Sequence, residues 1–243
     1  MIDFKALLWR RLFAWMSARD LIPVVTMEQA SQVALVNTTL FDCPGPKFLH
    51  VGCGGARKPN VGPGFLSDDW HEVRLDIDPA AAPDVVSSML DMSPVPTASV
   101  DAVYSSHNIE HLYPHEVPVA LIEFFRVLKP SGILVLTCPD LQSLCRLVVE
   151  DKLDEPVYVS PAGPIAPIDV LYGHRPPMAA GNLYMAHRTG FTLKTLVTAV
   201  RAAGFRAVAG KSREASFDLW LVASKSLLEA SEISRLAAIH FPP

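Results

Sequence analysis

The glycine-rich stretch GCGG at residues 52–55 is the part of the sequence best suited to binding a nucleotide. It directly follows the apolar run KFLHV at residues 47–51, which predicts a β-strand. Glycine has no side chain and adopts positive φ values freely, so the backbone there can pass close to a ligand. Asp76 lies 22 residues after Gly54, near the end of the apolar run VRLDI at residues 73–77. A carboxylate at that point can accept hydrogen bonds from the two hydroxyls of a ribose, so we predict an adenosine-containing cofactor.

Arg57 and Pro59 argue against NAD as that cofactor. The dinucleotide fingerprint G-x-G-x-x-G, counted from Gly52, requires glycine at position 57, where this chain has arginine. Pro59 is in addition a poor start for the helix whose N-terminus binds a pyrophosphate. An NAD-dependent oxidoreductase is therefore disfavoured.

Asp91 and Met92 are further candidates for this site. The Asp91 carboxylate suits the amino group of an adenine, and the Met92 side chain suits packing on its ring. In open α/β sheets, ligands bind beyond the carboxyl ends of the strands. We therefore expect these two residues to converge with the glycine loop and Asp76.

Four segments in this order resemble successive motifs of class I S-adenosylmethionine-dependent methyltransferases. They are FLHVGCGG, VRLDIDP, LDMSPVPTASVDAVYSSHNIEHL and RVLKPSGILVLTCPDL. The resemblance covers about residues 47–150, with weaker support to residue 224, and is greatest to small bacterial enzymes that share the EHL and LKP-G patterns. It implies S-adenosyl-L-methionine as the cofactor. It also implies a Rossmann-like α/β fold, doubly wound around a mainly parallel seven-stranded sheet of order 3-2-1-4-5-7-6, with the last strand antiparallel.

The same resemblance implies a role for individual residues. Gly52 and Gly54 would approach the methionine part of the cofactor, and Asp76 its ribose. Ser106 and His107 would lie near the methionine moiety and the reactive methyl group. The complete set of predicted cofactor-binding residues is Val51, Gly52, Cys53, Gly54, Asp76, Ile77, Asp91, Met92, Ser106 and His107.

The chain departs from this family pattern directly after the glycine loop. Where many similar proteins have a full helix, it has the sequence ARKPNVGPGF at residues 56–65, with two prolines and two glycines. Proline and glycine both disfavour a helix interior. We therefore predict that this helix is missing or very short.

His107 and His111 are the predicted catalytic residues. Methyl transfer is an in-line displacement that depends mainly on alignment and desolvation, and it needs a general base only when the acceptor loses a proton. Glu110, between them, is better explained as a brace for the following helix. His107, His111 and His115 recur every four residues, a spacing that could bind a metal from one helix face. Pro114 interrupts such a helix, so no metal is predicted.

The regular elements that must position these residues follow from apolar periodicity. The run ILVLTC should form a strand after a type I turn at Pro130-Ser131-Gly132. Strands are expected at residues 47–51, 73–77, 100–105, 133–138, 205–209 and 217–224, and helices at residues 2–16, 26–40, 114–128, 141–150, 193–203 and 227–239. These elements predict an N-terminal helical extension (1–45), a methyltransferase domain (46–225) and a C-terminal helix (226–243).

Residues 151–190 are predicted to form an insertion that acts as a lid and binds the substrate. Six prolines between residues 153 and 177 exclude long helices and strands there. Loops on a rigid scaffold often supply specificity, although these side chains could equally serve only to anchor the insertion. If they bind substrate, their charge favours a polar or anionic acceptor. The predicted substrate-binding residues are Tyr172, His174, Tyr184, His187 and Arg188.

Composition narrows the class of partner. The net charge of −4 and a pI near 6.0 disfavour nucleic acid, so a small-molecule acceptor is expected. The four cysteines have no C-x-x-C spacing, which argues against structural zinc and a disulfide framework. No apolar run approaches the roughly 20 residues that span a bilayer. We therefore expect a cytoplasmic protein without stable membrane insertion.

The N-terminal helices allow two interpretations. In the methyltransferases that the chain resembles, N-terminal helices cover the acceptor pocket or mediate contacts in a homodimer, and this is the preferred interpretation. Lys5, Arg10 and Arg11 beside aromatic residues could instead rest on a membrane surface. The alternative function is therefore a non-catalytic relative of the fold that acts as an interaction or membrane-surface protein.

Overall fold

The computed structural model describes residues 40–160 and 162–242. The helices predicted at residues 2–16 and 26–40 lie outside these ranges, apart from Leu40. The membrane-surface and dimer interpretations that depend on them therefore stay predictions. Among the described residues, no helix is both long and apolar enough to cross a membrane.

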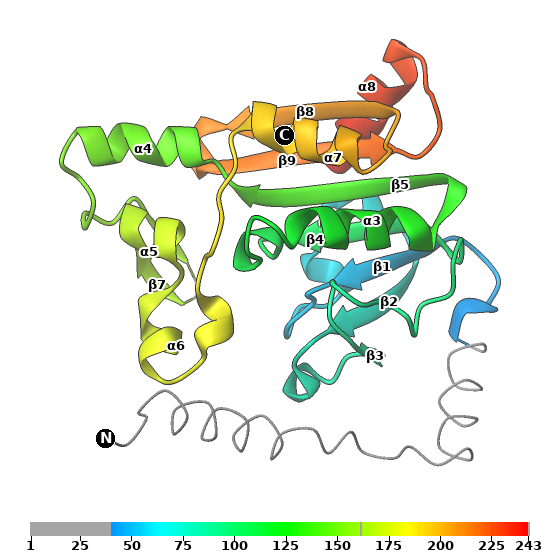
Figure 1. The fold of residues 1–243 in the computed structure, drawn as a ribbon, viewed down its shortest axis with the longest axis horizontal. Helices are drawn as coiled ribbons and strands as arrows, with labels where there is room; N and C mark the ends of the chain where they lie inside the picture. Colours follow the sequence, from blue (N-terminus) through cyan, green and yellow to red (C-terminus); the bar gives the residue numbers. More distant parts are fainter. Residues whose placement is uncertain (1–39, 161, 243) are drawn as a thin grey trace, which may run out of the picture. The chain divides into compact units, whose positions relative to one another are not determined.

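A seven-stranded sheet is the framework of the described chain (Figure 1). Strands β1 to β5 run parallel to one another, whereas β9 runs antiparallel to both β5 and β8. Counted within this sheet, the order β3-β2-β1-β4-β5-β9-β8 is 3-2-1-4-5-7-6 with the last strand antiparallel, so the predicted Rossmann-like fold class is confirmed. The strands are β1 (Lys47–Val51), β2 (His71–Asp76), β3 (Val85–Val86), β4 (Val100–Ser106), β5 (Leu128–Pro139), β8 (Ala207–Arg213) and β9 (Asp218–Ser224).

Helices cover both faces of this sheet, as a doubly wound fold requires. In Figure 1, α3 and α7 lie in front of the strands, and α8 lies behind β8 and β9. The short strand β3 had no counterpart among the predicted elements. The helices are α3 (Val117–Val127), α4 (Leu141–Val149), α5 (Pro167–Tyr172), α6 (Arg175–Ala179), α7 (Leu193–Ala202) and α8 (Ala230–His240).

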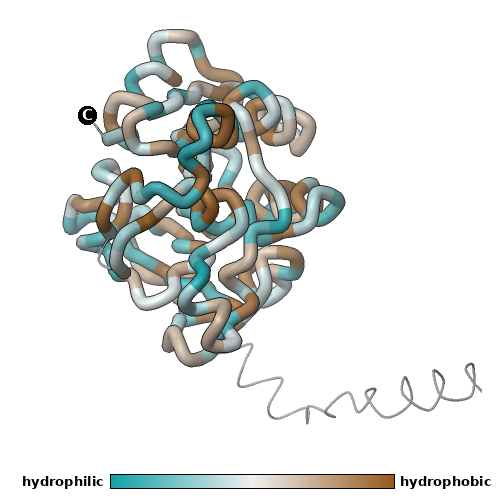
Figure 2. Tube along the Cα trace, turned by 90° about the vertical axis from the view of Figure 1, so that its left-hand side faces the viewer, coloured by the Kyte–Doolittle hydropathy of each residue, from teal (hydrophilic) through white to brown (hydrophobic). Residues whose placement is uncertain are grey.

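The alternation of side chains along each strand produces two hydrophobic cores. Leu134 and Leu136 of β5 pack in the core under α3 and α7, while Ile133 and Val135 pack on the other face with α8. Successive side chains of a strand point to opposite faces, so a continuous apolar run serves both cores. In Figure 2, hydrophobic and hydrophilic residues alternate every few positions along the outer segments, as expected for elements buried on one side.

Between β1 and β2, a stretch that is described throughout, the chain forms two 3-10 helices and no α-helix. They are η1 (Lys58–Asn60) and η2 (Pro63–Phe65), so the prediction of a missing or very short helix is confirmed. Phe65 takes up the space: it is fully buried and stacks on Phe48, with ring centroids 4.6 Å apart. Its edges contact Trp70 and His240. An aromatic cluster thus covers the face of the sheet that a helix would otherwise cover.

The predicted turn at residues 130–132 falls inside β5, at an irregularity in its pairing with β4. Val100 pairs with Leu128 and Ala102 with Ile133, which is five steps on β5 against two on β4, so three extra residues bulge from the strand. The carbonyls of this bulge bond to the segment that follows β9, where Ser226 Oγ donates to Pro130 O at 2.7 Å. The turn type itself stays a prediction.

Residues 151–190 form short elements, as the prolines predict. A hairpin of β6 (Tyr158–Ser160) and β7 (Gly163–Ile165) is followed by α5, α6 and the 3-10 helix η5 (Leu183–Met185). The insertion begins after α4 and returns to the sheet at Phe191, which forms a bridge with Asp140 at the end of β5. It therefore lies beyond the carboxyl end of β5.

His240 should make the stability of the fold depend on pH. Its side chain is buried, and burial lowers its pKa from 6.5 to about 4. The unfolded chain takes up a proton below pH 6.5, whereas the folded chain resists until about pH 4, so stability is lost as the pH falls through this window. For this residue we expect a loss of about 2 kcal/mol between pH 7 and pH 5.

Urea unfolding of His240→Phe at the two pH values measures this contribution. The variant should lose about 2 kcal/mol less than the wild-type protein over the same interval. His115→Phe is the matched control, because His115 is exposed and should leave the pH dependence as it is. An equal pH dependence in His240→Phe and wild type would contradict the assignment.

Candidate functional site

A cavity of about 350 Å³ lies at the carboxyl ends of β1, β2 and β4. This is the edge of the sheet at which open α/β folds bind ligands. Residues from the insertion close part of it. The predicted site residues that line it are Val51, Gly52, Gly54, Asp76, Ile77, His107, His111, Tyr184 and Arg188.

Gly52 and Gly54 give the loop after β1 its shape. Both have positive φ values, +65° and +48°. A Cβ on Gly52 would overlap the side chain of Asn108, so no other residue fits there without a shift. The amide of Gly52 donates to Leu75 O at 2.8 Å, which fixes the loop against β2.

Asp76 holds the same loop from the end of β2. Its Oδ2 accepts a hydrogen bond from the amide of Gly54 at 2.7 Å, and its Oδ1 accepts one from the amide of Asp78 at 2.9 Å. Each carboxylate oxygen can accept a further hydrogen bond. The carboxylate therefore shapes the cavity and retains capacity for a ligand in it.

Arg74 is a central residue that the sequence did not point to. It is buried two positions before Asp76 on β2, and its guanidinium donates only to backbone carbonyls. The acceptors are the carbonyls of Gly54 in the glycine loop, of Ala56 directly after it, and of Ala81 and Ala82 at the end of η3 (Pro79–Ala81), with the bond to Ala82 at 2.7 Å. One buried charge thus joins the two loops that border the cavity. The available signal is an arginine between the apolar residues Val73 and Leu75 of the strand.

Asp91 and Met92 are not brought into the cavity. Asp91 is exposed, and its Oδ1 accepts from the amide of Ser93 at 3.1 Å. Met92 is fully buried in the core. The chain reverses between Ser88 and Asp91, and the turn directs Met89 and Leu90 toward the cavity instead.

Cys53 and Ser106 also lie beside the cavity without lining it. Burial raises the pKa of the Cys53 thiol to about 11, so the thiol stays protonated at neutral pH. Ser106 Oγ forms a hydrogen bond with Thr137 Oγ1 at 2.9 Å, linking β4 to β5. Both residues support the neighbouring strands.

His107 is open to the cavity and has an unusual backbone. Its φ of +48° lies in the left-handed region, which costs a non-glycine residue on the order of 1 kcal/mol and is often found at functional sites. Half of its side chain is exposed, and its Nδ1 lies 3.6 Å from Oε1 of Glu110. Loss of solvent acts to lower the pKa of His107, but the Glu110 carboxylate raises it by more, so the net pKa is above its usual value.

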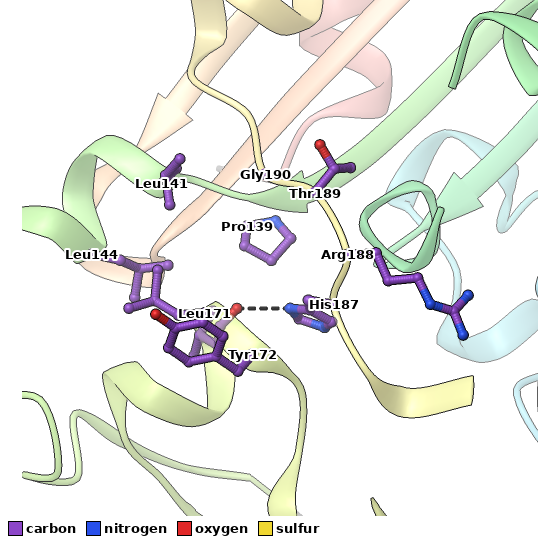
Figure 3. Close-up of a pocket in the computed structure, with 10 residues that line it drawn as sticks. Pro139, Leu141, Leu144, Leu171, Tyr172, His187, Arg188, Thr189 and Gly190 are labelled. Carbon is purple, nitrogen blue, oxygen red and sulfur yellow. Dashed lines mark hydrogen bonds between the residues drawn. The ribbon is translucent and has the colours of Figure 1, made fainter. Parts of the chain in front are cut away.

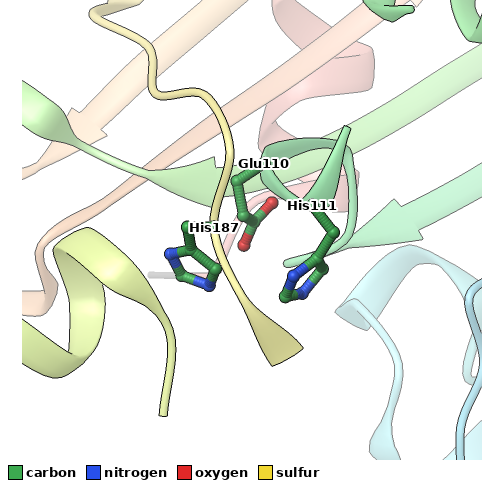
Figure 4. Close-up of side chains that lie close together, drawn as sticks. All are labelled: Glu110, His111 and His187. Carbon is green, nitrogen blue, oxygen red and sulfur yellow. The ribbon is translucent and has the colours of Figure 1, made fainter. Parts of the chain in front are cut away.

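Glu110 lies in the 3-10 helix η4 (Ile109–His111) and is surrounded by histidines. Burial acts to raise the pKa of its carboxyl, but His107 foremost, with His111 and His187, lowers it by more, so the net pKa is below its usual value. Burial lowers the pKa of His187. Figure 4 shows the Glu110 carboxylate between the rings of His111 and His187. The sequence did not predict this group, because His187 comes from the insertion.

The chain of the insertion is bound directly to η4. The amides of Arg188 and Thr189 both donate to Glu110 O, at 2.8 and 3.2 Å. The Arg188 side chain donates to His111 O at 2.9 Å and lies over the ring of Tyr113. Arg188 therefore forms part of the wall of this cavity.

The remaining predicted substrate residues are divided among separate hollows. Tyr184 and Arg188 line the cavity at the ends of β1, β2 and β4, which is called the main cavity from here on. Tyr172 and His187 line a second cavity of about 250 Å³, which Arg188 also borders (Figure 3). His174 lies in another depression of the insertion, beside Asp169. The structure therefore brings two of the five predicted residues to the main cavity.

His107, His111 and His115 do not share a helix face. Between β4 and α3 the chain forms the short helix η4 (Ile109–His111), and α3 begins only at Val117. His115 lies between them and stacks on Tyr113, with ring centroids 5.7 Å apart. The four-residue spacing of these histidines therefore does not place their rings on one helix face.

Comparisons with known proteins agree with this fold. Residues 49–136 match the family model described as a methyltransferase domain. A curated relative from Mycolicibacterium smegmatis, a probable S-adenosylmethionine-dependent methyltransferase, is 32% identical over 108 residues, which cover 40% of this chain and 40% of the relative. The chain thus matches less than half the length of that relative.

Two solved structures resemble the chain more loosely. The 1,6-didemethyltoxoflavin-N1-methyltransferase of Burkholderia thailandensis, solved with S-adenosylhomocysteine, is 17% identical and covers 91% of this chain and 89% of its own, with a TM-score of 0.47. An S-adenosylmethionine-dependent methyltransferase of Methanosarcina mazei is 17% identical, covers 79% of this chain and 97% of its own, and has a TM-score of 0.49. Residues 49–136 thus match the model of a methyltransferase domain, and they lie in a sheet whose strand order is β3-β2-β1-β4-β5-β9-β8.

Proposed function

We propose that this protein transfers the methyl group of S-adenosylmethionine to a small-molecule acceptor. The observation that carries the proposal is the main cavity, where the bent glycine loop and the Asp76 carboxylate meet at the carboxyl edge of the sheet. Backbone without side chains beside a carboxylate suits a ligand with a ribose and a zwitterionic tail. Residues 151–190 serve as the acceptor side of the site.

Individual residues of the cavity fit parts of the cofactor. Asp76 would accept hydrogen bonds from the ribose, and the loop at Gly52 would approach the methionine part. The apolar side chains of Ile77 and Leu90 line the same cavity and suit an adenine ring. The cofactor supplies a methyl carbon bound to a positively charged sulfur, which makes the carbon electrophilic.

The remaining chemistry falls to the chain itself. The acceptor atom bonds to the methyl carbon as the carbon–sulfur bond breaks and its electron pair remains on sulfur, so alignment is decisive. His107, half-exposed in the cavity, is the proposed base for an acceptor that loses a proton. Tyr184 and Arg188 of the insertion would position the acceptor and exclude water.

Replacing Asp76 tests the donor side of the proposal. Asp76→Asn loses the negative charge and one acceptor oxygen, so the affinity for S-adenosylhomocysteine should fall roughly 10- to 100-fold. Calorimetry measures it. Asp91→Asn is the control, because Asp91 lies outside the cavity and should leave affinity unchanged. Equal affinity in wild type and Asp76→Asn, or an absence of binding to wild type, would refute the proposed cofactor site.

The glycine loop offers a second matched pair. Gly52→Ala should lower both the affinity for S-adenosylhomocysteine and the free energy of unfolding, the latter by roughly 1–2 kcal/mol, because Gly52 has positive φ and contacts Asn108. A Cβ on Gly55 would meet nothing within 4 Å, so Gly55→Ala should behave as wild type. Similar binding by both variants would show that the loop does not hold the cofactor.

Methyl transfer itself can be tested without knowing the acceptor. The protein is incubated with methyl-labelled S-adenosylmethionine and a protein-free, nucleic-acid-free extract of small molecules, and labelled products are separated by chromatography. We expect a labelled small molecule with wild type and roughly 100-fold slower labelling with His107→Asn, whose affinity for S-adenosylhomocysteine should be retained. Label that appears only on macromolecules when those are added would contradict a small-molecule acceptor.

A further inference from the structure

Glu110 is a buried carboxylate whose oxygens find no hydrogen-bond partner in the described part of the chain. Its side chain is 1% exposed, and neither Oε1 nor Oε2 forms a hydrogen bond with any described residue. The ion-pairing group found for it in the described chain is His107, at 3.6 Å. Removing a carboxylate from water costs several kcal/mol unless it is paired, hydrogen-bonded or bound to a metal. Among the described residues, the ion pair with His107 is thus a long one, and it leaves both carboxylate oxygens without a hydrogen bond.

His111 and His187 present free nitrogens on either side of this carboxylate. Nδ1 of His111 lies 3.1 Å from Ala186 O, and Nδ1 of His187 lies 2.8 Å from Val170 O. A carbonyl can only accept, so each Nδ1 must carry the hydrogen. In the neutral ring this leaves the lone pair on Nε2. Histidines that bind metals are typically held in this way, with the other ring N–H donated to a backbone carbonyl.

The three side chains converge on a common point. One ligand atom from each of Glu110, His111 and His187 lies within 4.8 Å of the other two. When three atoms lie within 4.8 Å of one another, some point lies within about 2.8 Å of all three, whereas imidazole and carboxylate ligands of zinc lie at roughly 2.0–2.2 Å. Ion binding would therefore require the three side chains to move slightly closer together. Figure 4 shows the carboxylate directed into the space between the two rings.

We propose that Glu110, His111 and His187 bind a divalent transition-metal ion. Two imidazoles with one carboxylate favour zinc, iron, manganese or cobalt over magnesium and calcium, which prefer oxygen ligands alone. Three protein ligands leave coordination positions open for water or a bound molecule. The dication would also supply the positive charge that the buried carboxylate lacks.

The position of the site gives the ion access to bound molecules. His111 lines the main cavity and His187 lines the second one, so the ligand group lies in the wall between them. An ion with open positions there would bind an oxygen or nitrogen atom of a molecule in either cavity. It would also link η4 to the insertion, in addition to the hydrogen bonds from Arg188 and Thr189.

Zinc binding by the full chain tests the proposal directly. The tag-free protein is treated with a chelator, dialysed and titrated with zinc in a calorimeter, and metal retained after gel filtration is measured by elemental analysis. We expect one equivalent of zinc and a higher melting temperature on binding, because the ion would bind the folded chain. Failure of the wild-type protein to bind zinc, cobalt, manganese or iron(II) would overturn the proposal.

Asparagine variants separate the metal from the hydrogen bonds. In His111→Asn and His187→Asn, the side-chain amide can still donate to the carbonyl that accepts from Nδ1, but the Nε2 ligand is gone. Each should lower zinc affinity at least roughly 100-fold, since even outer-shell changes cost 10- to 100-fold. His115→Asn is the control, because His115 stacks on Tyr113 away from the group and should bind zinc as wild type does. Unchanged affinity in both asparagine variants would exclude these ligands.

Glu110→Gln distinguishes a metal ligand from a simple ion-pair partner of His107. If Glu110 is a ligand, the variant should lose zinc binding while its melting temperature without metal is equal to or above that of wild type, because an uncompensated buried charge has been removed. A lower melting temperature without metal, together with retained zinc affinity, would instead identify Glu110 as part of a structural ion pair and contradict the proposal.

Discussion

The contacts of Arg74 set the form of the site. A buried guanidinium must have its hydrogen bonds satisfied, and here backbone carbonyls of two loops do so. Asp76 lies two positions further along β2 and holds the same glycine loop through the amide of Gly54. On β2, the Arg74 side chain thus donates to backbone carbonyls, and the Asp76 side chain accepts from backbone amides. Both requirements are met only when the glycine loop takes its observed course, and the cavity follows from that course.

The aromatic cluster between β1 and β2 follows from the absence of an α-helix in that segment. Without a helix, the face of the sheet around Phe48 needs another cover, and Phe65 and Trp70 supply it together with α8. The cover is closely packed, because a Cβ on Gly64 would overlap the ring of His240. Residues near the start of the described chain are thereby packed against residues near its end. The segment between β1 and β2 and the C-terminal helix α8 are therefore parts of one packing arrangement.

The sequence predicted those features that depend on local periodicity and failed where tertiary contacts decide. Apolar alternation located most strands, and the prolines of residues 56–65 predicted the short 3-10 helices. The bulge at residues 130–132 follows tertiary hydrogen bonds that no local pattern encodes. The sequence predicts Asp91 at the cavity, but the chain reverses between Ser88 and Asp91. Met89 and Leu90 therefore line the cavity in its place. His187 reaches Glu110 across 77 residues of chain, a contact that spacing alone cannot indicate.

The way α4 and the insertion together leave and rejoin the sheet makes residues 141–190 a separable module. Asp140 and Phe191 are bridged neighbours, and the amide of Leu141 donates to Phe191 O at 2.9 Å, so about fifty residues begin and end at nearly one point. Loop-closure entropy grows only slowly with length, so an exchange of this segment for another need not disturb the strands that hold the donor site. A chimaera joined at these two positions would keep the glycine loop with its hydrogen bonds to Arg74 and Asp76. It would replace Tyr184, His187 and Arg188 together. Residues 141–190 are thus a natural unit for redesigning the proposed acceptor side of the protein.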